Sequence, residues 1–294
     1  MEWKTRRIDA ILEQALTEDK ATSDLTTAVT IDPGLRATAT IIAKEECVLC
    51  GVGCIPRFLE IFARLDGRSS GRYEVVSHPE IFDGVRLRKG QAVAVIRHNA
   101  RVILACERVI LNLMQRLSGI ATLTRRYVDE VEQTGAKVLD TRKTIPGLRI
   151  LEKYAVRCGG GENHRLDLSD GILIKNNHIS LGGGIEKVLA SAQQKRQPGQ
   201  TIDIEVRNLQ ELELALDNGA ESLLLDNMSP SEVKKCVALI QGRGLSVPVE
   251  ASGGITLENI RKYALAGPDY ISVGALTHSA PAVDLSMRIT AELY

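Results

Sequence analysis

The chain has 294 residues, of which 44% are hydrophobic and 25% are charged, a composition typical of globular proteins with one large or two smaller domains. Its 37 basic residues balance its 37 acidic residues, and only 3% are aromatic, which excludes an extended, aromatic-rich surface for nucleic acid. No apolar run is long enough to cross a bilayer, so we expect no membrane partner.

The start of the chain and its cysteines indicate a reducing compartment. Residues 1–7 lack the apolar core of a signal peptide. Cys47, Cys50 and Cys54 form a cluster that could begin a zinc or iron–sulfur site, but no second cysteine pair or nearby histidine completes it. We therefore expect a cytoplasmic protein whose clustered cysteines are buried small side chains rather than metal ligands.

The first part of the chain, residues 1–112, has the pattern of an α+β domain with a mostly antiparallel sheet. The apolar spacing predicts helices over residues 7–16 and 55–65, and strands over residues 37–43, 47–52, 73–77 and 92–98. A longer helical pattern follows over residues 102–132, where Ser118-Gly119 marks a bend or a break between two helices.

After Gly135 the pattern alternates between strand and helix. The predicted strands are residues 137–141, 172–175, 202–206, 222–226, 248–251 and 270–273. The predicted helices are residues 148–157, 185–195, 209–218, 231–241 and 257–266. Regular alternation of this kind favours a parallel sheet that is closed, or nearly closed, into a barrel. This second domain is predicted over residues 113–280, and the terminal segment 281–294 is predicted to return to the first domain as a helix over residues 283–293.

Charged and small residues follow the predicted strands, where the functional residues of α/β barrels gather. In chain order these residues are Arg142, Lys143, Lys175, Glu205, Asp226, Ser252, Gly253, Gly254, Ser272 and Gly274. Residues 140–179 are rich in Arg and Lys although the whole chain is neutral, which favours a small anionic ligand.

The two acids and the glycines suit different parts of a phosphorylated sugar. Glu205 and Asp226 can bind ribose hydroxyls, directly or through Mg²⁺, and stabilise a cationic sugar. The alternative is a salt bridge to Lys175 or Lys143 that only holds the barrel together. The backbone N–H groups of the Ser252–Gly254 turn can bind phosphate, although a simple tight turn has the same sequence.

Several motifs, spread over nearly the whole chain, resemble those of the quinolinate phosphoribosyltransferase family. They are Glu18-Asp19, Ser23-Asp24-Leu25-Thr26-Thr27, Glu107-Arg108, Asp140-Thr141-Arg142-Lys143, Asn163-His164-Arg165, Ile204-Glu205-Val206, Leu225-Asp226-Asn227, Glu250-Ala251-Ser252-Gly253-Gly254 and Ser272-Val273-Gly274. One position departs from the family pattern, because Asn176 stands where the family usually has an acid after the strand lysine.

The resemblance implies an incomplete six-stranded barrel preceded by a smaller sheet domain. It implies transfer of phosphoribose from phosphoribosyl pyrophosphate to quinolinate with decarboxylation, in the biosynthesis of NAD, with Mg²⁺ as cofactor. The residues that would bind substrate or act in catalysis are Arg108, Arg142, Lys143, His164, Arg165, Lys175, Glu205 and Asp226. Arg108 would reach the active site of the neighbouring subunit in a homodimer, and further assembly is left open.

Three alternatives remain at this point. The nearest is a related barrel enzyme that transfers phosphoribose to nicotinate, which has one carboxylate. The second is a lyase that uses Lys175 to form a Schiff base. The third is a ligand-binding protein that keeps the scaffold, although a binder would not require the full set of charged residues.

Overall fold

The computed structural model describes residues 1–67 and 72–292. The chain divides into two compact units, the first formed by residues 1–123, 146–160 and 280 onward, and the second by residues 124–145 and 161–279. This division differs from the predicted boundary between residues 112 and 113. Helix α4 (Ala100–Val131) runs without interruption through that position, and the chain passes between the units more than once.

The first unit combines helices with a four-stranded antiparallel sheet. Its remaining elements are α1 (Arg6–Glu18), the short 3-10 helix η1 (Ala21–Ser23), α2 (Leu25–Thr30), β1 (Arg36–Ala43), β2 (Cys47–Val48), α3 (Cys54–Asp66), β3 (Glu74–Val76), β4 (Arg86–Leu87), β5 (Ala92–Asn99), α5 (Arg149–Cys158) and β12 (Leu285–Ala291). The strand order is β12-β1-β5-β3, and β2 pairs with β4 in a separate ribbon. Residues along β1 alternate between buried and half-buried, as expected for a strand with one face on a core.

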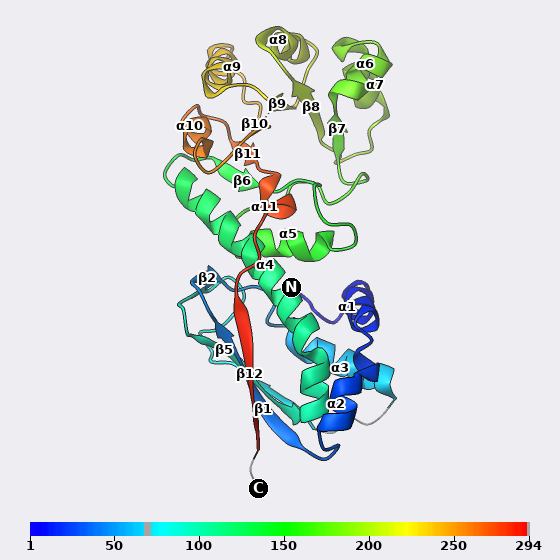
Figure 1. The fold of residues 1–294 in the computed structure, drawn as a ribbon. Coiled ribbons are helices and arrows are strands. Elements are labelled where there is room, and N and C mark those ends of the chain that lie inside the picture. Colours follow the sequence, from blue (N-terminus) through cyan, green and yellow to red (C-terminus); the bar gives the residue numbers. More distant parts are fainter. Residues whose placement is uncertain (68–71, 293–294) are drawn as a thin grey trace. The chain divides into compact units, whose positions relative to one another are not determined.

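The C-terminal segment is a strand, so the prediction of a helix over residues 283–293 is wrong. β12 pairs antiparallel with β1, from Ala43 opposite Leu285 to Ala37 opposite Ala291 (Figure 1). Apolar and polar residues alternate along β12, and this period of two fits a strand better than a helix. Of the predicted segment 281–294, residues 293 and 294 lie outside the described part of the chain.

The Ser118-Gly119 pair serves close packing, and α4 continues through it without the predicted break. The Ser118 hydroxyl accepts a hydrogen bond from the Cys50 backbone N–H at 2.9 Å. A Cβ on Gly119 would collide with the carbonyl oxygen of Pro281, so this position needs glycine to let the C-terminal segment approach. The predicted interruption of the helix is therefore absent, and α4 is continuous over 32 residues.

The second unit is an α/β barrel left open on one side. Its elements are β6 (Lys137–Leu139), β7 (Ile172–Ile174), α6 (Asn176–Gly182), α7 (Ile185–Lys195), β8 (Ile202–Val206), α8 (Leu209–Asp217), β9 (Ser222–Asp226), α9 (Pro230–Gly242), β10 (Val249–Ser252), α10 (Ile260–Ala264), β11 (Tyr270–Ser272) and α11 (Ala275–His278). All pairs in the order β6-β11-β10-β9-β8-β7 are parallel, and helices α7 to α10 lie outside the strands (Figure 1). Within the described residues, β6 and β7 do not pair with each other, which confirms the predicted incomplete six-stranded barrel.

Burial explains why the barrel strands read as continuous apolar runs. In β9, the consecutive residues Leu223, Leu224 and Leu225 are all buried, because both faces of a parallel barrel strand are covered. The clustered cysteines Cys47 and Cys50 are buried and free, and Cys54 is fully buried. In residues 1–67 and 72–292, no helix has both the length and the apolar character needed to span a bilayer.

Candidate active site

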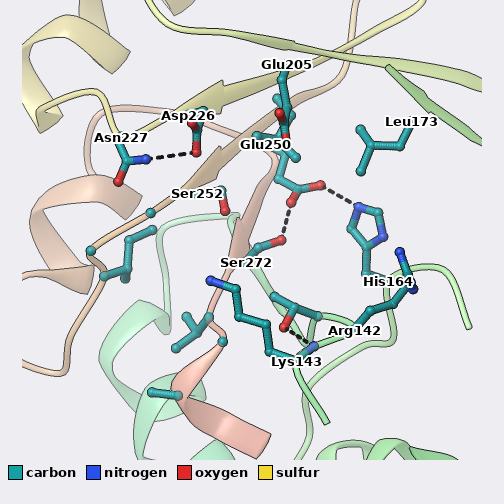
Figure 2. A pocket seen from close by; sticks show the side chains of 18 of the residues that line it. Arg142, Lys143, His164, Leu173, Glu205, Asp226, Asn227, Glu250, Ser252 and Ser272 are labelled. Atoms are coloured by element: carbon teal, nitrogen blue, oxygen red, sulfur yellow. Dashed lines mark hydrogen bonds and ion pairs between the residues drawn. The ribbon is translucent and has the colours of Figure 1, made fainter. Parts of the chain in front are cut away.

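The barrel has a cavity of about 590 Å³ at the carboxyl ends of its strands, and the second unit alone supplies its lining (Figure 2). The predicted site residues that line it are Arg142, Lys143, His164, Arg165, Lys175, Glu205, Asp226, Ser252, Gly253, Gly254, Ser272 and Gly274. The structure therefore brings together residues that are spread over more than a hundred positions of the sequence. A cavity of this size is ample for a small ligand.

Strand register explains why several of these side chains lie at the same level. Ser252 at the end of β10 is paired with Asp226 at the end of β9 and with Ser272 at the end of β11. Glu205 lies on β8 opposite Leu224, two residues before the Asp226 level. Parallel strands in this register present their last side chains to one edge of the sheet, so the two carboxylates and two hydroxyls face a common space.

Lys143 lies on a turn held by the hydroxyls of two threonines. Its backbone N–H donates to Thr141 Oγ1 at 3.1 Å, and its carbonyl accepts from Thr277 Oγ1 at 2.8 Å. A Cβ on Gly274 would lie only 3.1 Å from Lys143 Cδ, so the small residue leaves room for the lysine side chain. The side chain extends into the cavity on the side opposite Glu205 (Figure 2). No pattern in the sequence indicated that Thr277 fixes this turn.

Glu205 is buried and already has two partners. Its Oε1 lies 3.3 Å from Lys175 Nζ, and its Oε2 accepts from the Asn176 backbone N–H at 3.2 Å. The salt bridge that the sequence allowed as an alternative role is therefore present. It lies inside the cavity, so it is compatible with a role in binding a ligand.

The turn at Gly253 is shaped by Asn227. Asn227 has φ 56° and donates from Nδ2 to Asp226 Oδ1 at 3.0 Å. Gly253 has φ 95°, and a Cβ there would run into the Asn227 side chain. Glycine is thus required at residue 253 by both backbone conformation and space. Gly254 has φ 62° with open space around it, and both glycines line the cavity, where the backbone N–H groups of such a turn can bind phosphate.

The basic side of the cavity keeps its positive charges close together. Burial, and then the neighbouring charge of Arg142, lower the pKa of the Arg165 guanidinium. Carboxylates of the ligand would relieve this repulsion, and the planar guanidinium groups can bind them through two parallel hydrogen bonds.

His164 belongs to a hydrogen-bonded group that no sequence pattern predicted. Its Nε2 lies 3.2 Å from Glu250 Oε2, and Glu250 Oε1 accepts from the Ser272 hydroxyl (Figure 2). The His164 backbone N–H donates to Asp140 Oδ1 at 2.9 Å. Glu250 and Asp140 lie within motifs quoted for the family, but nothing in their spacing indicated that they meet His164.

Arg108 is the one predicted site residue that does not line this cavity. It is exposed on α4, in the part of that helix that belongs to the first unit. The structure describes a single chain, and the predicted role of Arg108 concerns a second subunit. The placement therefore leaves that role as a prediction.

The donor set of the cavity suits a magnesium ion shared with a phosphorylated ligand. Glu205 and Asp226 offer carboxylate oxygens from neighbouring strands. Mg²⁺ in enzymes commonly takes one or two carboxylates and completes its shell with water and phosphate oxygens. No group of three or more His, Cys, Asp or Glu side chains in the described residues forms a closed metal cage, so a protein-only site is not indicated.

Comparison with known proteins gives a consistent result along the chain. The profile described as quinolinate phosphoribosyl transferase, N-terminal domain, matches residues 24–118, and the corresponding C-terminal domain profile matches residues 120–288. A probable carboxylating nicotinate-nucleotide pyrophosphorylase of Bacillus subtilis (strain 168) is 40% identical, over 97% of this chain and 94% of that protein. The Mycobacterium leprae (strain TN) carboxylating nicotinate-nucleotide pyrophosphorylase is also 40% identical, over 95% of each. The crystal structure of NadC from Streptococcus pyogenes has a TM-score of 0.87 at 39% identity and 97% coverage of both chains.

Proposed function

The chain belongs to the quinolinate phosphoribosyltransferase family, and we propose that the cavity at the carboxyl ends of its barrel strands is the site of the family's reaction. The enzyme transfers phosphoribose from phosphoribosyl pyrophosphate to quinolinate, with decarboxylation, in the biosynthesis of NAD. The products are nicotinate mononucleotide, pyrophosphate and CO₂. The observation that carries the assignment of the site is the convergence of basic side chains, two carboxylates and a glycine turn on one cavity.

Quinolinate would lie against the basic side of the cavity. Arg142 and Arg165 would bind its carboxylates through their guanidinium groups, and Lys175 would add a point charge. The repulsion that lowers the pKa of Arg165 would be relieved by the substrate dianion. Two carboxylates need more positive charge than one, so three basic side chains on this side favour quinolinate over nicotinate.

Phosphoribosyl pyrophosphate would lie on the side of the cavity opposite the basic residues. The phosphate carried by its ribose would lie at the Gly253 turn, and the ribose itself near Glu205 and Asp226. The ring nitrogen of quinolinate is a weak nucleophile, so departure of pyrophosphate must lead and positive charge develops on the sugar. Glu205 and Asp226 would stabilise that charge, and Lys143 would stabilise the leaving pyrophosphate. Magnesium, held by the two carboxylates directly or through water, would neutralise phosphate charge when bound.

Decarboxylation requires no covalent nucleophile from the protein. Once the ring nitrogen carries the ribose, its positive charge can stabilise the electron pair that remains on the adjacent carbon when CO₂ leaves, and a proton then takes its place. The chain's task is to hold the second carboxylate while this happens. In this proposal Arg142 and Arg165, which both line the cavity, do so.

The lyase alternative is weakened by the surroundings of Lys175. Lysines that form Schiff bases are typically desolvated or placed beside another cation. The Lys175 side chain is 48% exposed and pairs with the Glu205 carboxylate. Borohydride trapping with a carbonyl substrate would still detect such an activity.

We also propose a homodimer in which Arg108 of the partner subunit completes the quinolinate site. Arg108 is exposed on α4, as this role requires. Leu25 and Val29 on α2 are 81% and 83% exposed, and exposed apolar residues of this kind support a subunit contact. The six free cysteines support a cytoplasmic location.

The direct test is to incubate the purified protein with Mg²⁺, quinolinate and phosphoribosyl pyrophosphate. Chromatography should detect nicotinate mononucleotide, and carboxyl-labelled quinolinate should release an equal amount of labelled CO₂. Replacing quinolinate by nicotinate tests the related activity. Product from nicotinate but none from quinolinate would overturn the proposal in favour of the related transferase.

A further inference from the structure

A buried carboxylate with no assigned role lies beside the proposed quinolinate site. Glu250 is 9% exposed on β10, two residues before the end of that strand, and it faces the cavity between Ser272 and His164 (Figure 2). A carboxylate here would repel the carboxylates of quinolinate unless hydrogen-bond donors of the protein compensated its negative charge. The neighbours of Glu250 supply such donors.

Both oxygens of Glu250 are engaged within the protein. The Ser272 hydroxyl donates to Oε1, and His164 Nε2 lies 3.2 Å from Oε2. Only 11% of the Glu250 side chain and 14% of the His164 side chain are exposed. A pair so well enclosed is held in one arrangement, because breaking it would leave a buried charge unsatisfied.

The other ring nitrogen of His164 is also engaged. Nδ1 accepts a hydrogen bond from the Arg165 backbone N–H at 2.7 Å. An acceptor carries no proton, so the proton of the neutral ring lies on Nε2 and points to Glu250. Both ring nitrogens are engaged within the protein, which argues for a structural link through the ring.

These hydrogen bonds connect Glu250, through the His164 ring, to Arg165, which is proposed to bind quinolinate. Glu250 fixes the His164 ring, the ring accepts from the Arg165 N–H, and Arg165 carries a guanidinium into the cavity. His164, Arg165 and Glu250 also line a second cavity of about 570 Å³ in the same unit. The three residues therefore lie between two open spaces.

We infer that Glu250 is a positioning residue that holds His164 in its Nε2–H tautomer and thereby fixes Arg165 for quinolinate. The inference rests on the proposed function, because it takes quinolinate as the ligand of Arg165. It assigns Glu250 a role as a hydrogen-bond acceptor for His164. Its negative charge is not required for that role.

Two substitutions separate the hydrogen-bond acceptor of Glu250 from its negative charge. Glu250→Met keeps the side-chain length and removes the acceptor, and we expect KM for quinolinate to rise about tenfold or more, while KM for phosphoribosyl pyrophosphate changes less than about twofold. Glu250→Gln keeps an acceptor for His164 Nε2–H and can donate to Ser272, so KM for quinolinate should stay within about threefold of the original value. Glu162→Met is the matched control, because Glu162 lines only the second cavity and pairs with Lys137.

The tautomer itself can be observed in the unchanged protein. Long-range ¹⁵N–¹H correlation spectra report which ring nitrogen is protonated, and a His164→Gln variant assigns the signal among five histidines. We expect the proton on Nε2. A proton on Nδ1, or equal impairment of the Gln and Met variants, would overturn the inference while quinolinate turnover stays intact. Absence of turnover in the unchanged protein would instead overturn the proposed function.

Discussion

Lys175 and Glu205 form an ion pair inside the cavity, with Nζ 3.3 Å from Oε1, across the neighbouring strands β7 and β8. The pair joins the proposed quinolinate side to the proposed ribose side. Removing the charge of either partner should therefore affect the binding of both substrates. This coupling makes Glu205 the most informative single position for testing the proposed roles.

Glu205→Gln should lower kcat by about 100-fold or more, because the amide cannot stabilise developing positive charge on the sugar. The fold should be retained, since the amide still accepts from the Asn176 backbone N–H. Steady-state assays at saturating substrates and thermal unfolding measure the two effects. Glu213→Gln on the exposed side of α8 is the control and should behave as the original protein. A kcat within about threefold of the original would contradict the assignment.

Lys143→Ala should reduce kcat/KM for phosphoribosyl pyrophosphate by about 100-fold, because the leaving pyrophosphate loses its cation. Thr277→Val is a graded companion. It removes the hydroxyl that donates to the Lys143 carbonyl and should cost about tenfold or less, by loosening the turn. Equal loss in the two variants would indicate that the turn, and not the Lys143 ammonium, carries the effect.

The arrangement of the second unit follows from features that are local in the sequence. Regular alternation of apolar strands and helices predicted a parallel barrel, and the end of each strand predicted the cavity lining. These inferences succeed because parallel strands place their carboxyl ends at one edge whatever the loops between them do. Glu205 and Asp226 were foreseen in this way.

The remaining features depend on contacts between segments that are distant in sequence. Glu250 meets His164, which lies 86 positions earlier in the sequence, and no spacing rule connects them. Gly119 looked like a helix interruption because the carbonyl of Pro281 that approaches it cannot be inferred locally. The terminal strand β12 was misread as a helix because its partner β1 lies at the other end of the chain.

His98 should make stability depend on pH. It is fully buried in β5, and burial, followed by the charge of Arg36, lowers its pKa from 6.5. Below pH 6.5 the His98 side chain binds a proton in the unfolded chain but stays neutral in the folded chain until the pH reaches its lowered pKa. The free energy of unfolding should therefore fall as the pH drops from 6.5 through the lowered pKa. Above pH 6.5 this residue should add no pH dependence.

His98→Phe should remove this dependence. The ring can still stack near Tyr73, whose centroid lies 5.9 Å away. His98 Nε2 has no hydrogen-bond partner among the described residues, but Nδ1 accepts from the Asn99 backbone N–H at 2.7 Å. The gain and the loss should together leave the free energy of unfolding within about 1 kcal/mol of the original near neutral pH. Urea unfolding at about pH 5.5 and about pH 7.5 measures both effects, with exposed His78→Asn as control. An unchanged pH slope in His98→Phe would show that another group is responsible.

Arg108→Ala and Glu205→Gln subunits should complement each other in mixed dimers. Each homodimer lacks one requirement of the proposed shared site, whereas a hybrid holds one site with both Arg108 and Glu205 intact. Random mixing at equal amounts gives about half hybrids, so activity should recover to about a quarter of the original. Co-expression with two affinity tags isolates the hybrid. Hybrids as inactive as their parents would count against sharing of the site between subunits.

The role of the Gly253 turn can be tested by comparing Gly253 with Gly199, because both glycines have a positive φ. Gly253 and Gly199 have φ 95° and 84°, so alanine strains both, but only at Gly253 would a Cβ meet the Asn227 side chain and approach its backbone N to 3.0 Å. Gly199→Ala should lower the free energy of unfolding by about 1 kcal/mol with little change in KM for phosphoribosyl pyrophosphate. Gly253→Ala should cost about 2–3 kcal/mol and raise that KM about tenfold or more, because the backbone N–H groups of the turn must shift. Urea unfolding and initial rates measure both quantities. If the two variants raised KM equally, the effect would belong to general strain, and the Gly253 turn would lose its role as the phosphate site.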